Sequence, residues 1–203
     1  MTWSKQIRTT WATATAVALV LTAAATLVAA EKTPRVASAA APRVSVAGTG
    51  NGAYRIEGSF RVDARQAVAW SVLTDYDNLS SFVSSMRSSS AARRESGRLL
   101  VTQEAVGRAG PFSRTLHVVL EVTEEPPGRI EFRDVCGASF QSYAGAWTID
   151  SDGAGARVTY TLEARPRSSP PFFARSILAS NARGLLEQVR LEMLRRGRTA
   201  CAH

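Results

Sequence analysis

The chain has 203 residues, a net charge of +8 and 45% hydrophobic residues, which is typical of one globular domain with a substantial core. Only 21% of its residues are charged, so a mainly disordered chain is excluded. The two cysteines form neither a disulfide framework nor a Cys/His metal-binding pattern, and we expect no metal or other cofactor.

The first 39 residues have the features of a signal peptide. Lys5 and Arg8 precede an uncharged run over residues 11–30, and Ala37-Ser38-Ala39 fits the small-x-small pattern of a cleavage site. We expect residues 1–39 to be removed on export to the periplasm or the medium. Cleavage would lower the net charge to +5, since it removes four basic residues and one acidic residue. The alternative is an uncleaved membrane anchor, because the apolar run is just long enough to span a bilayer.

The next segment leads into the first expected strand. Residues 40–52 are rich in Ala, Pro, Gly, Ser and Thr, and this composition predicts a linker. Over residues 54–62 apolar and polar side chains alternate, which is the period of a strand with one face in water. We therefore expect the folded domain to begin at Tyr54.

Two short helices are expected after this strand. Asp63 is followed three residues later by Gln66, a spacing that resembles a capping box and predicts a helix through residues 68–73. The acidic segment over residues 75–78 is expected to cap a second helix over residues 79–83.

The middle of the chain predicts an antiparallel sheet. Alternating side chains predict five further strands, over residues 99–104, 115–122, 130–132, 143–149 and 158–163. Turn-forming sequences at residues 107–111, 126–128 and 152–153 separate most of them. Connections this short indicate antiparallel neighbours, since parallel strands need long crossovers. The Ser-rich stretch over residues 85–97 predicts a loop.

One long helix is expected at the C-terminal end. Ser169 before Pro170-Pro171 is typical of a helix start, and an apolar stripe then continues to about Arg196. Such a helix would be about 40 Å long. Because one of its faces is apolar along this whole length, we expect it to lie across the sheet.

Three fragments resemble the START, polyketide cyclase/dehydrase and coenzyme-Q-binding superfamily. They are VAWSVLTDYDNL at residues 68–79, EEPPGRIEF at residues 124–132 and GAWTI at residues 145–149. The resemblance implies an α+β helix-grip fold over residues 53–199. In this fold a seven-stranded, curled antiparallel sheet wraps around a long C-terminal helix, with two short helices after the first strand. It also implies that the seventh strand lies within residues 84–95, where the pattern predicts a loop.

The resemblance further implies a cavity between the sheet and the long helix. The apolar side chains expected to face it are Phe60, Phe82, Met86, Leu99, Val101, Leu116, Val118, Phe132, Tyr143, Trp147, Tyr160, Phe173, Ile177, Leu178 and Leu185. The alternative is that the same side chains fill a solid core.

No residue is predicted to be catalytic. His203 is terminal, and His117 lies on the polar face of its strand, where an exposed structural role is expected. Helix capping accounts for Asp63, Asp75 and Asp77 more simply than a carboxylate cluster does.

The basic charge does not indicate a nucleic-acid partner. The aromatic side chains alternate onto the inner face of the sheet, away from Arg55, Arg61 and Arg157. We expect Arg195, Arg196 and Arg198 to be solvated charges at a helix end, with weak contact to an anionic membrane surface as the alternative.

These features favour a protein that binds a lipid- or quinone-like molecule and carries or sequesters it. Two alternatives remain at this point. One is an aromatase/cyclase-type enzyme acting on a bound apolar chain, and the other is a structural or interaction module with a filled core.

Overall fold

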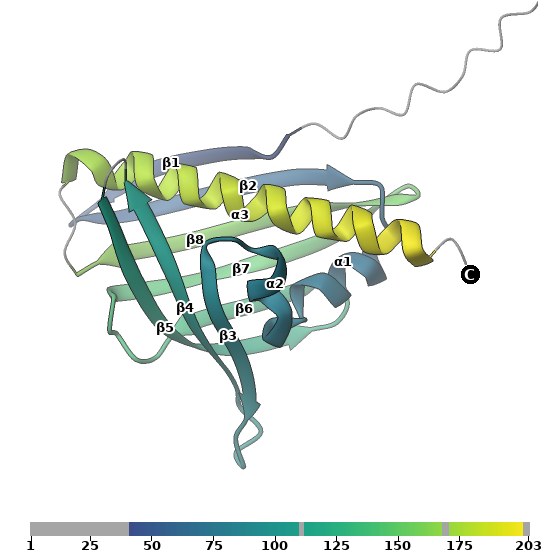
Figure 1. Cartoon of the computed structure of the whole chain (residues 1–203), viewed down its shortest axis with the longest axis horizontal. Coiled ribbons are helices and arrows are strands. Elements are labelled where there is room, and N and C mark those ends of the chain that lie inside the picture. The colour runs from purple at the N-terminus through teal and green to yellow at the C-terminus, as the bar shows by residue number, and fades with distance from the viewer. Residues whose placement is uncertain (1–40, 110–111, 168–170, 201–203) are drawn as a thin grey trace, which may run out of the picture. The chain divides into compact units, whose positions relative to one another are not determined.

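The computed structural model describes residues 41–109, 112–167 and 171–200. These residues form one sheet of eight strands and one long helix, with short helices after the second strand (Figure 1). The strands are β1 (Arg43–Gly50), β2 (Ala53–Val62), β3 (Met86–Arg93), β4 (Leu99–Ala109), β5 (Phe112–Glu125), β6 (Arg129–Asp134), β7 (Phe140–Asp152) and β8 (Gly155–Pro166). The helices are α1 (Gln66–Leu73), η1 (Tyr76–Asn78), α2 (Leu79–Phe82) and α3 (Pro171–Ala200).

The sheet has the order β1-β2-β8-β7-β6-β5-β4-β3, and every neighbouring pair is antiparallel. After β2 the chain passes through α1, η1 and α2 to β3 at the opposite edge. It then returns strand by strand until β8 pairs with β2. This arrangement confirms the predicted helix-grip fold and the six strands expected from alternation.

The sheet has eight strands where seven were expected, because the predicted linker over residues 40–52 contains β1. Val44 and Val46 of this strand pack towards the core, and Val46 is 6% exposed. The glycine-rich sequence is instead the turn of the β1–β2 hairpin, in which Gly50, Asn51 and Gly52 all have positive φ angles. Composition alone predicted a linker because only two side chains of β1 carry the apolar signal.

The Ser-rich stretch that the pattern predicts to be a loop forms β3, within the range that the family resemblance implied. Its alternation is hidden because Ser89, rather than an apolar residue, takes the buried position at its centre. Gln103 of β4 donates a hydrogen bond to the Ser89 hydroxyl (3.4 Å). A buried serine in this strand therefore has a polar partner across the sheet.

The predicted capping box is wrong. Arg65 occupies the N-cap position of α1, and no side chain caps the helix there. Gln66 instead donates to the backbone oxygen of Ile149 (2.7 Å) and accepts a hydrogen bond from Ser151 (3.1 Å). The residue expected to close a local motif thus connects α1 to β7.

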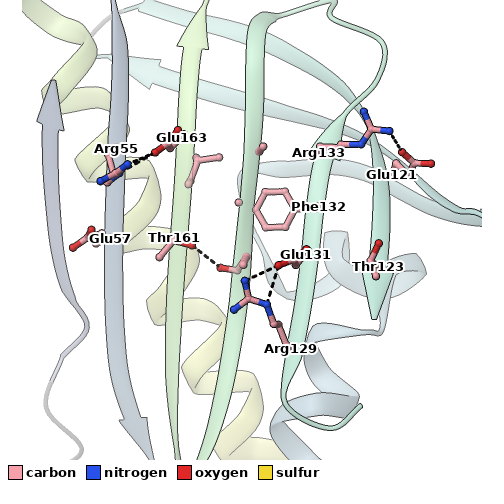
Figure 2. Close-up of a pocket in the computed structure, with 14 residues that line it drawn as sticks. Arg55, Glu57, Glu121, Thr123, Arg129, Glu131, Phe132, Arg133, Thr161 and Glu163 are labelled. Carbon is pink, nitrogen blue, oxygen red and sulfur yellow. Dashed lines mark hydrogen bonds and ion pairs between the residues drawn. The ribbon is translucent and has the colours of Figure 1, made fainter. Parts of the chain in front are cut away.

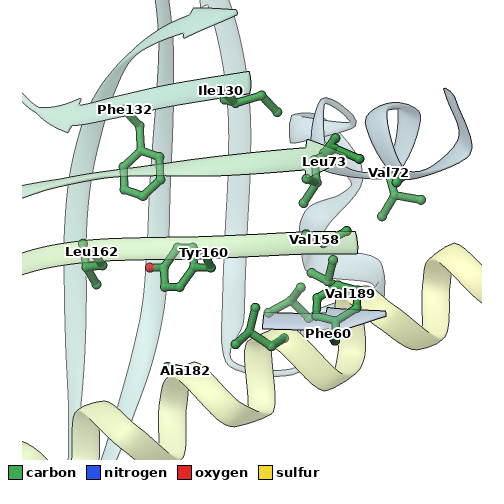
Figure 3. Close-up of a cluster of buried hydrophobic side chains, with 14 of the residues drawn as sticks. Phe60, Val72, Leu73, Ile130, Phe132, Val158, Tyr160, Leu162, Ala182 and Val189 are labelled. Carbon is green, nitrogen blue, oxygen red and sulfur yellow. The ribbon is translucent and has the colours of Figure 1, made fainter. Parts of the chain in front are cut away.

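The sheet curls around α3. This helix packs against β1 and β2 at one edge of the sheet and against β4 near the other. The strands β8, β7, β6 and β5 lie between these in the sheet order, so a flat sheet could not place them all beside one helix. Leu186, Val189 and Met193 of α3 are fully buried, and Figure 3 shows Val189 beside Phe60 of β2. The core is therefore densest along β2, and space remains beneath the middle strands.

Candidate ligand-binding cavity

A small cavity of about 80 Å³ lies between the inner face of the middle strands and α3. The sheet contributes most of its wall, the η1–α2 segment and β3 close one side, and α3 closes another. The lining residues are Leu73, Tyr76, Leu79, Val83, Met86, Val101, Gln103, Leu120, Val122, Ile130, Phe132, Tyr143, Trp147, Tyr160, Leu185 and Val189. Eleven of these sixteen side chains are purely apolar, which is the composition expected where an apolar molecule binds.

Seven of the residues expected in the cavity line it: Met86, Val101, Phe132, Tyr143, Trp147, Tyr160 and Leu185. Phe60, Leu99 and Val118 are buried in the core outside the cavity. Phe82, Leu116, Ile177 and Leu178 are partly buried and also lie outside it. The side chain of Phe173 lies outside the described residues.

Other lining residues were not predicted. Leu73, Leu79 and Val83 come from α1 and the short α2 segment, which close one end of the cavity. Their sequence pattern indicated short helices but not the face each would bury. Gln103 continues the inward alternation of Leu99 and Val101, so the strand pattern alone could have identified it.

An aromatic cluster forms part of the wall. The ring centroids of Trp147 and Tyr160 are 4.5 Å apart, and those of Phe132 and Tyr143 are 5.9 Å apart. Phe132 also stacks on Tyr160, with ring centroids 6.2 Å apart. Figure 3 shows both rings on the inner side of the strands. These separations are those of favourable aromatic pairs, so the wall is held rigid by its own packing.

The phenols of Tyr143 and Tyr160 both line the cavity, and each affects the pKa of the other. Burial raises the pKa of both phenols, and it raises that of Tyr160 most because Tyr143 adds to the effect. Both side chains therefore stay protonated and uncharged at neutral pH. The cavity wall thus holds these two phenols, together with the polar atoms of Tyr76, Gln103 and Trp147, in a mainly apolar surface.

The α2 segment that covers the cavity is bound to α3 by a polar clamp made of Asp75, Glu192, Arg195 and Arg196. Arg196 donates to Asp75 (Nη2–Oδ2, 2.7 Å) and to Glu192 (Nε–Oε1, 2.7 Å). Its guanidinium carbon also lies 5.7 Å from the centre of the Phe82 ring. Arg196 is therefore not the solvated helix-end charge that the sequence indicated.

The clamp changes the acidity of its carboxyls. Hydrogen bonds from Arg195 and then Arg196 lower the pKa of Glu192 to about 2 against the opposing effect of burial. Burial opposes ionisation of Asp75 too, but hydrogen bonds from Asn78 and Arg196 outweigh it and lower its pKa. Asp75 was expected to cap a helix and makes no capping bond.

Further polar contacts surround the same segment. Gln188 of α3 accepts from the backbone N–H of Ser84 (2.7 Å) and donates to its hydroxyl (2.8 Å). Tyr76 donates to Glu124 of β5 (2.8 Å), and Asp77 accepts from the backbone N–H of Ala91 (2.8 Å). The η1–α2 segment that covers the cavity is thus hydrogen-bonded to α3, β5 and β3.

A larger hollow of about 640 Å³ lies on the outer face of the sheet (Figure 2). Its floor contains the small side chains of Ala144, Ala146 and Thr161, and charged residues surround it. The charges are paired, as in Arg55–Glu163 and Arg129–Glu131 (2.6 Å). Since the side chains of these two pairs are 45–60% exposed, the hollow is a solvated surface rather than an apolar site.

The described residues show no alternative chemical centre. His117 is exposed, as expected. Over residues 41–109, 112–167 and 171–200 no group of three His, Cys, Asp or Glu side chains is placed to hold a metal ion. Within the same ranges no helix has both the length and the apolarity needed to cross a membrane. The expected signal peptide and Cys201 lie outside the described residues.

Comparison with solved structures gives the same fold. Human STARD10 superposes with a TM-score of 0.61 at 13% identity, covering 81% of this chain and 74% of that one. A STAR-related lipid transfer protein from Xanthomonas axonopodis superposes with a TM-score of 0.55 at 18% identity. The match covers 74% of this chain and 98% of that one. The di-domain aromatase/cyclase BexL, from the BE-7585A biosynthetic pathway, gives 0.57 at 13%, covering 70% of this chain. The present chain spans about half the length of that protein (50%).

Comparison at the level of sequence assigns the family. No curated protein matches the chain. The model of the family described as "Polyketide cyclase / dehydrase and lipid transport" matches residues 53–196, which is most of the chain. The chain therefore belongs to the polyketide cyclase/dehydrase and lipid transport family, whose fold implies a hydrophobic ligand-binding cavity between the sheet and α3.

Proposed function

We propose that the chain binds a lipid- or quinone-like molecule in its inner cavity and carries or sequesters it. The observation that carries this proposal is the apolar cavity enclosed between the middle strands, the α2 segment and α3. The chain's similarity to the STAR-related lipid transfer protein from Xanthomonas axonopodis supports it. Eleven apolar side chains would take the body of such a ligand out of water, which is the main driving force for its binding.

The cavity must enlarge before it can hold a lipid-sized ligand. At about 80 Å³ the space is smaller than the roughly 300–1,000 Å³ of most small-molecule sites. A lipid-sized ligand therefore has to displace part of the wall. Leu79 and Val83 belong to the short α2 segment and its end, which the polar clamp rather than the sheet ladder holds in place. We infer that this segment moves outward when a ligand enters.

A second candidate function is aromatase/cyclase-type catalysis. The phenols of Tyr143 and Tyr160 line the cavity, and general acids in enzymes are groups of this kind, positioned beside a bound substrate. The BexL structure is an aromatase/cyclase by its name. Carrier and enzyme are distinguished by the fate of the ligand, since a carrier releases it unchanged. Mass spectrometry of an organic extract of the purified protein would identify what is bound.

The binding proposal is tested with the neutral fluorescent probe 1-N-phenylnaphthylamine, displaced by a ubiquinone analogue. Leu185→Trp fills the cavity from α3, so we expect it to weaken probe binding at least tenfold. Leu191→Trp is the matched control, because Leu191 is on the same helix but 50% exposed.

The stability of Leu185→Trp distinguishes a cavity from a filled core. In a space that can open, the larger side chain should cost less than about 1 kcal/mol, whereas overpacking a filled core typically costs about 1–3 kcal/mol. Strong destabilisation of the Leu185→Trp variant, together with no saturable probe binding by the parent protein, would rule out the carrier function. The structural or interaction module with a filled core would then be favoured.

We also propose that residues 1–39 direct export to the periplasm or the medium, with an N-terminal membrane anchor as the alternative. The uncharged run and the Ala37-Ser38-Ala39 site support this. Weak contact with an anionic membrane surface would rely on exposed arginines such as Arg198, since Arg195 and Arg196 are bound within the clamp.

A further inference from the structure

We propose that the ligand carries an uncharged hydrogen-bond acceptor, such as a ketone, quinone or ester oxygen, which the Tyr143–Tyr160 pair binds while carboxylate ligands are excluded. This inference rests on the proposed binding function, and it names the chemical class that the cavity takes. Two independent features of the lining lead to it.

The first feature is the number of hydroxyl protons in the tyrosine pair. A phenol has one proton to donate and can also accept. Both phenols line the cavity, and a contact between them can use at most one of their two protons. In the described part of the chain neither hydroxyl makes a hydrogen bond to any other residue. One proton therefore remains, at the surface of an apolar cavity, and a guest oxygen that accepts it would complete the pair.

The second feature is the charge of the lining. Among the described residues, none of the sixteen side chains around the cavity is ionised at neutral pH. On α3, Arg190 beside the lining residue Val189 is already bound to Glu187. Arg195 and Arg196 are likewise bound to Glu192 and Asp75. A carboxylate inside the cavity would lose its hydration without gaining a cation, which is strongly unfavourable. A neutral oxygen loses far less and gains the phenol proton.

The aromatic cluster fits the same class of ligand. Trp147, Phe132 and Tyr160 present ring faces and edges around the hydroxyl pair. A planar or chain-like apolar body can pack on them while its single oxygen reaches the phenols. The site therefore selects by one neutral hydrogen bond in an apolar surface.

The test compares three ten-carbon compounds in the probe-displacement assay at pH 8: 2-decanone, 1-decene and decanoate. We expect the ketone to bind about fivefold more tightly than the alkene, the effect of one neutral hydrogen bond. Decanoate should bind at least tenfold more weakly than the ketone. Its affinity should rise as the pH is lowered towards 5, because a carboxyl of ordinary pKa, about 4.3–4.9, then becomes partly protonated.

The double variant Tyr143→Phe/Tyr160→Phe removes both protons and should abolish the preference for 2-decanone over 1-decene. Since both hydroxyls are removed together and the rings keep their shape, the fold should be kept, and thermal melts check this. Tyr54→Phe is the matched control, because Tyr54 packs against the core but does not line the cavity.

Equal binding of ketone and alkene by the parent would overturn the inference, and so would a ketone preference that survives in the double variant. Decanoate binding as tightly as 2-decanone at pH 8 would overturn it too. In each of these outcomes the protein still binds an apolar compound, so the proposed function would stand. If neither the probe nor any of the three compounds bound, the proposed function would fail and this inference with it.

Discussion

Arg196 offers a direct test of how the cover of the cavity is held. Arg196→Met keeps an unbranched side chain of similar length but removes the hydrogen bonds to Asp75 and Glu192. Glu192 keeps its second partner, Arg195, whereas Asp75 keeps only its bond from Asn78. The variant therefore separates the η1–α2 segment from α3 without leaving Glu192 unpaired.

The expected cost follows from the exposure of these groups. The side chains of Arg196 and Asp75 are 26% and 24% exposed, and that of Glu192 is 8% exposed. Fully exposed ion pairs contribute about 0–1 kcal/mol, and hydrogen bonds to charged groups about 1.5–3 kcal/mol. For partly buried groups we expect a loss of about 2 kcal/mol in the free energy of unfolding. In a domain of this size that lowers the Tm by roughly 4–8 °C.

Arg195→Met is the matched control. Arg195 makes the same contact with Glu192 (2.7 Å), but it is 62% exposed and belongs to the same helix turn. Its removal should cost less than about 1 kcal/mol. Urea denaturation of both variants measures the two free energies. Equal costs for the two arginines, or a cost below about 0.5 kcal/mol for Arg196→Met, would refute the idea that the clamp holds the cover.

The clamp also predicts a pH dependence. The pKa values of Asp75 and Glu192 are lower in the folded protein than in the unfolded chain, where a carboxyl has its ordinary value of about 4. Their contribution is therefore complete above about pH 5 and is lost as the pH falls from about 4.5 towards 2. The difference in stability between the parent and Arg196→Met should shrink over this interval. A difference that stays constant down to pH 3 would contradict the assignment.

Two further predictions concern the sheet and the N-terminal segment. Gly145→Ala should lower the free energy of unfolding by about 3 kcal/mol in urea denaturation, because a β-carbon there would lie 2.1 Å from the backbone oxygen of Thr161. Gly58→Ala should cost less, since its β-carbon would meet the end of the Leu186 side chain, which can rotate. For export, N-terminal sequencing of protein from an envelope fraction should begin near Ala40. A chain that still begins at Met1 would support the anchor.

The faces of the strands could be predicted because a strand fixes its side chains by alternation alone. Val101, Phe132, Trp147 and Tyr160 were each placed on the inner face by a period of two, and all four line the cavity. The same rule missed β1, where a glycine-rich end masks a short alternation of valines. Alternation also predicts which face of the sheet a side chain lies on, but not whether it borders the cavity or packs in the filled core. Phe60 was therefore expected in the cavity, whereas it lies in the core beside α3.

The helical side of the cavity was harder to predict because the stripe of α3 covers more than the cavity. The helix contacts β1, β2, β4 and α1 as it crosses the curled sheet. Leu185 and Val189 reach the cavity, whereas Leu178, about two turns before Leu185, does not. Which turn faces the empty space depends on the curvature of the sheet, and no local pattern in the sequence encodes that curvature.

The polar clamp shows the same limit for charges. Asp75 lies in a sequence typical of a helix cap, and local hydrogen bonds are the only partners that a linear pattern can indicate. Its partner Arg196 is 121 residues away, and the two meet only because α3 crosses the sheet and ends beside α1. A carboxylate without an evident local role, opposite an arginine at the end of a long helix, is therefore better interpreted as one half of a tertiary contact. In this protein that contact holds the segment which covers the cavity, so under the proposed function the stability of the fold and the entry of a ligand depend on the same side chains.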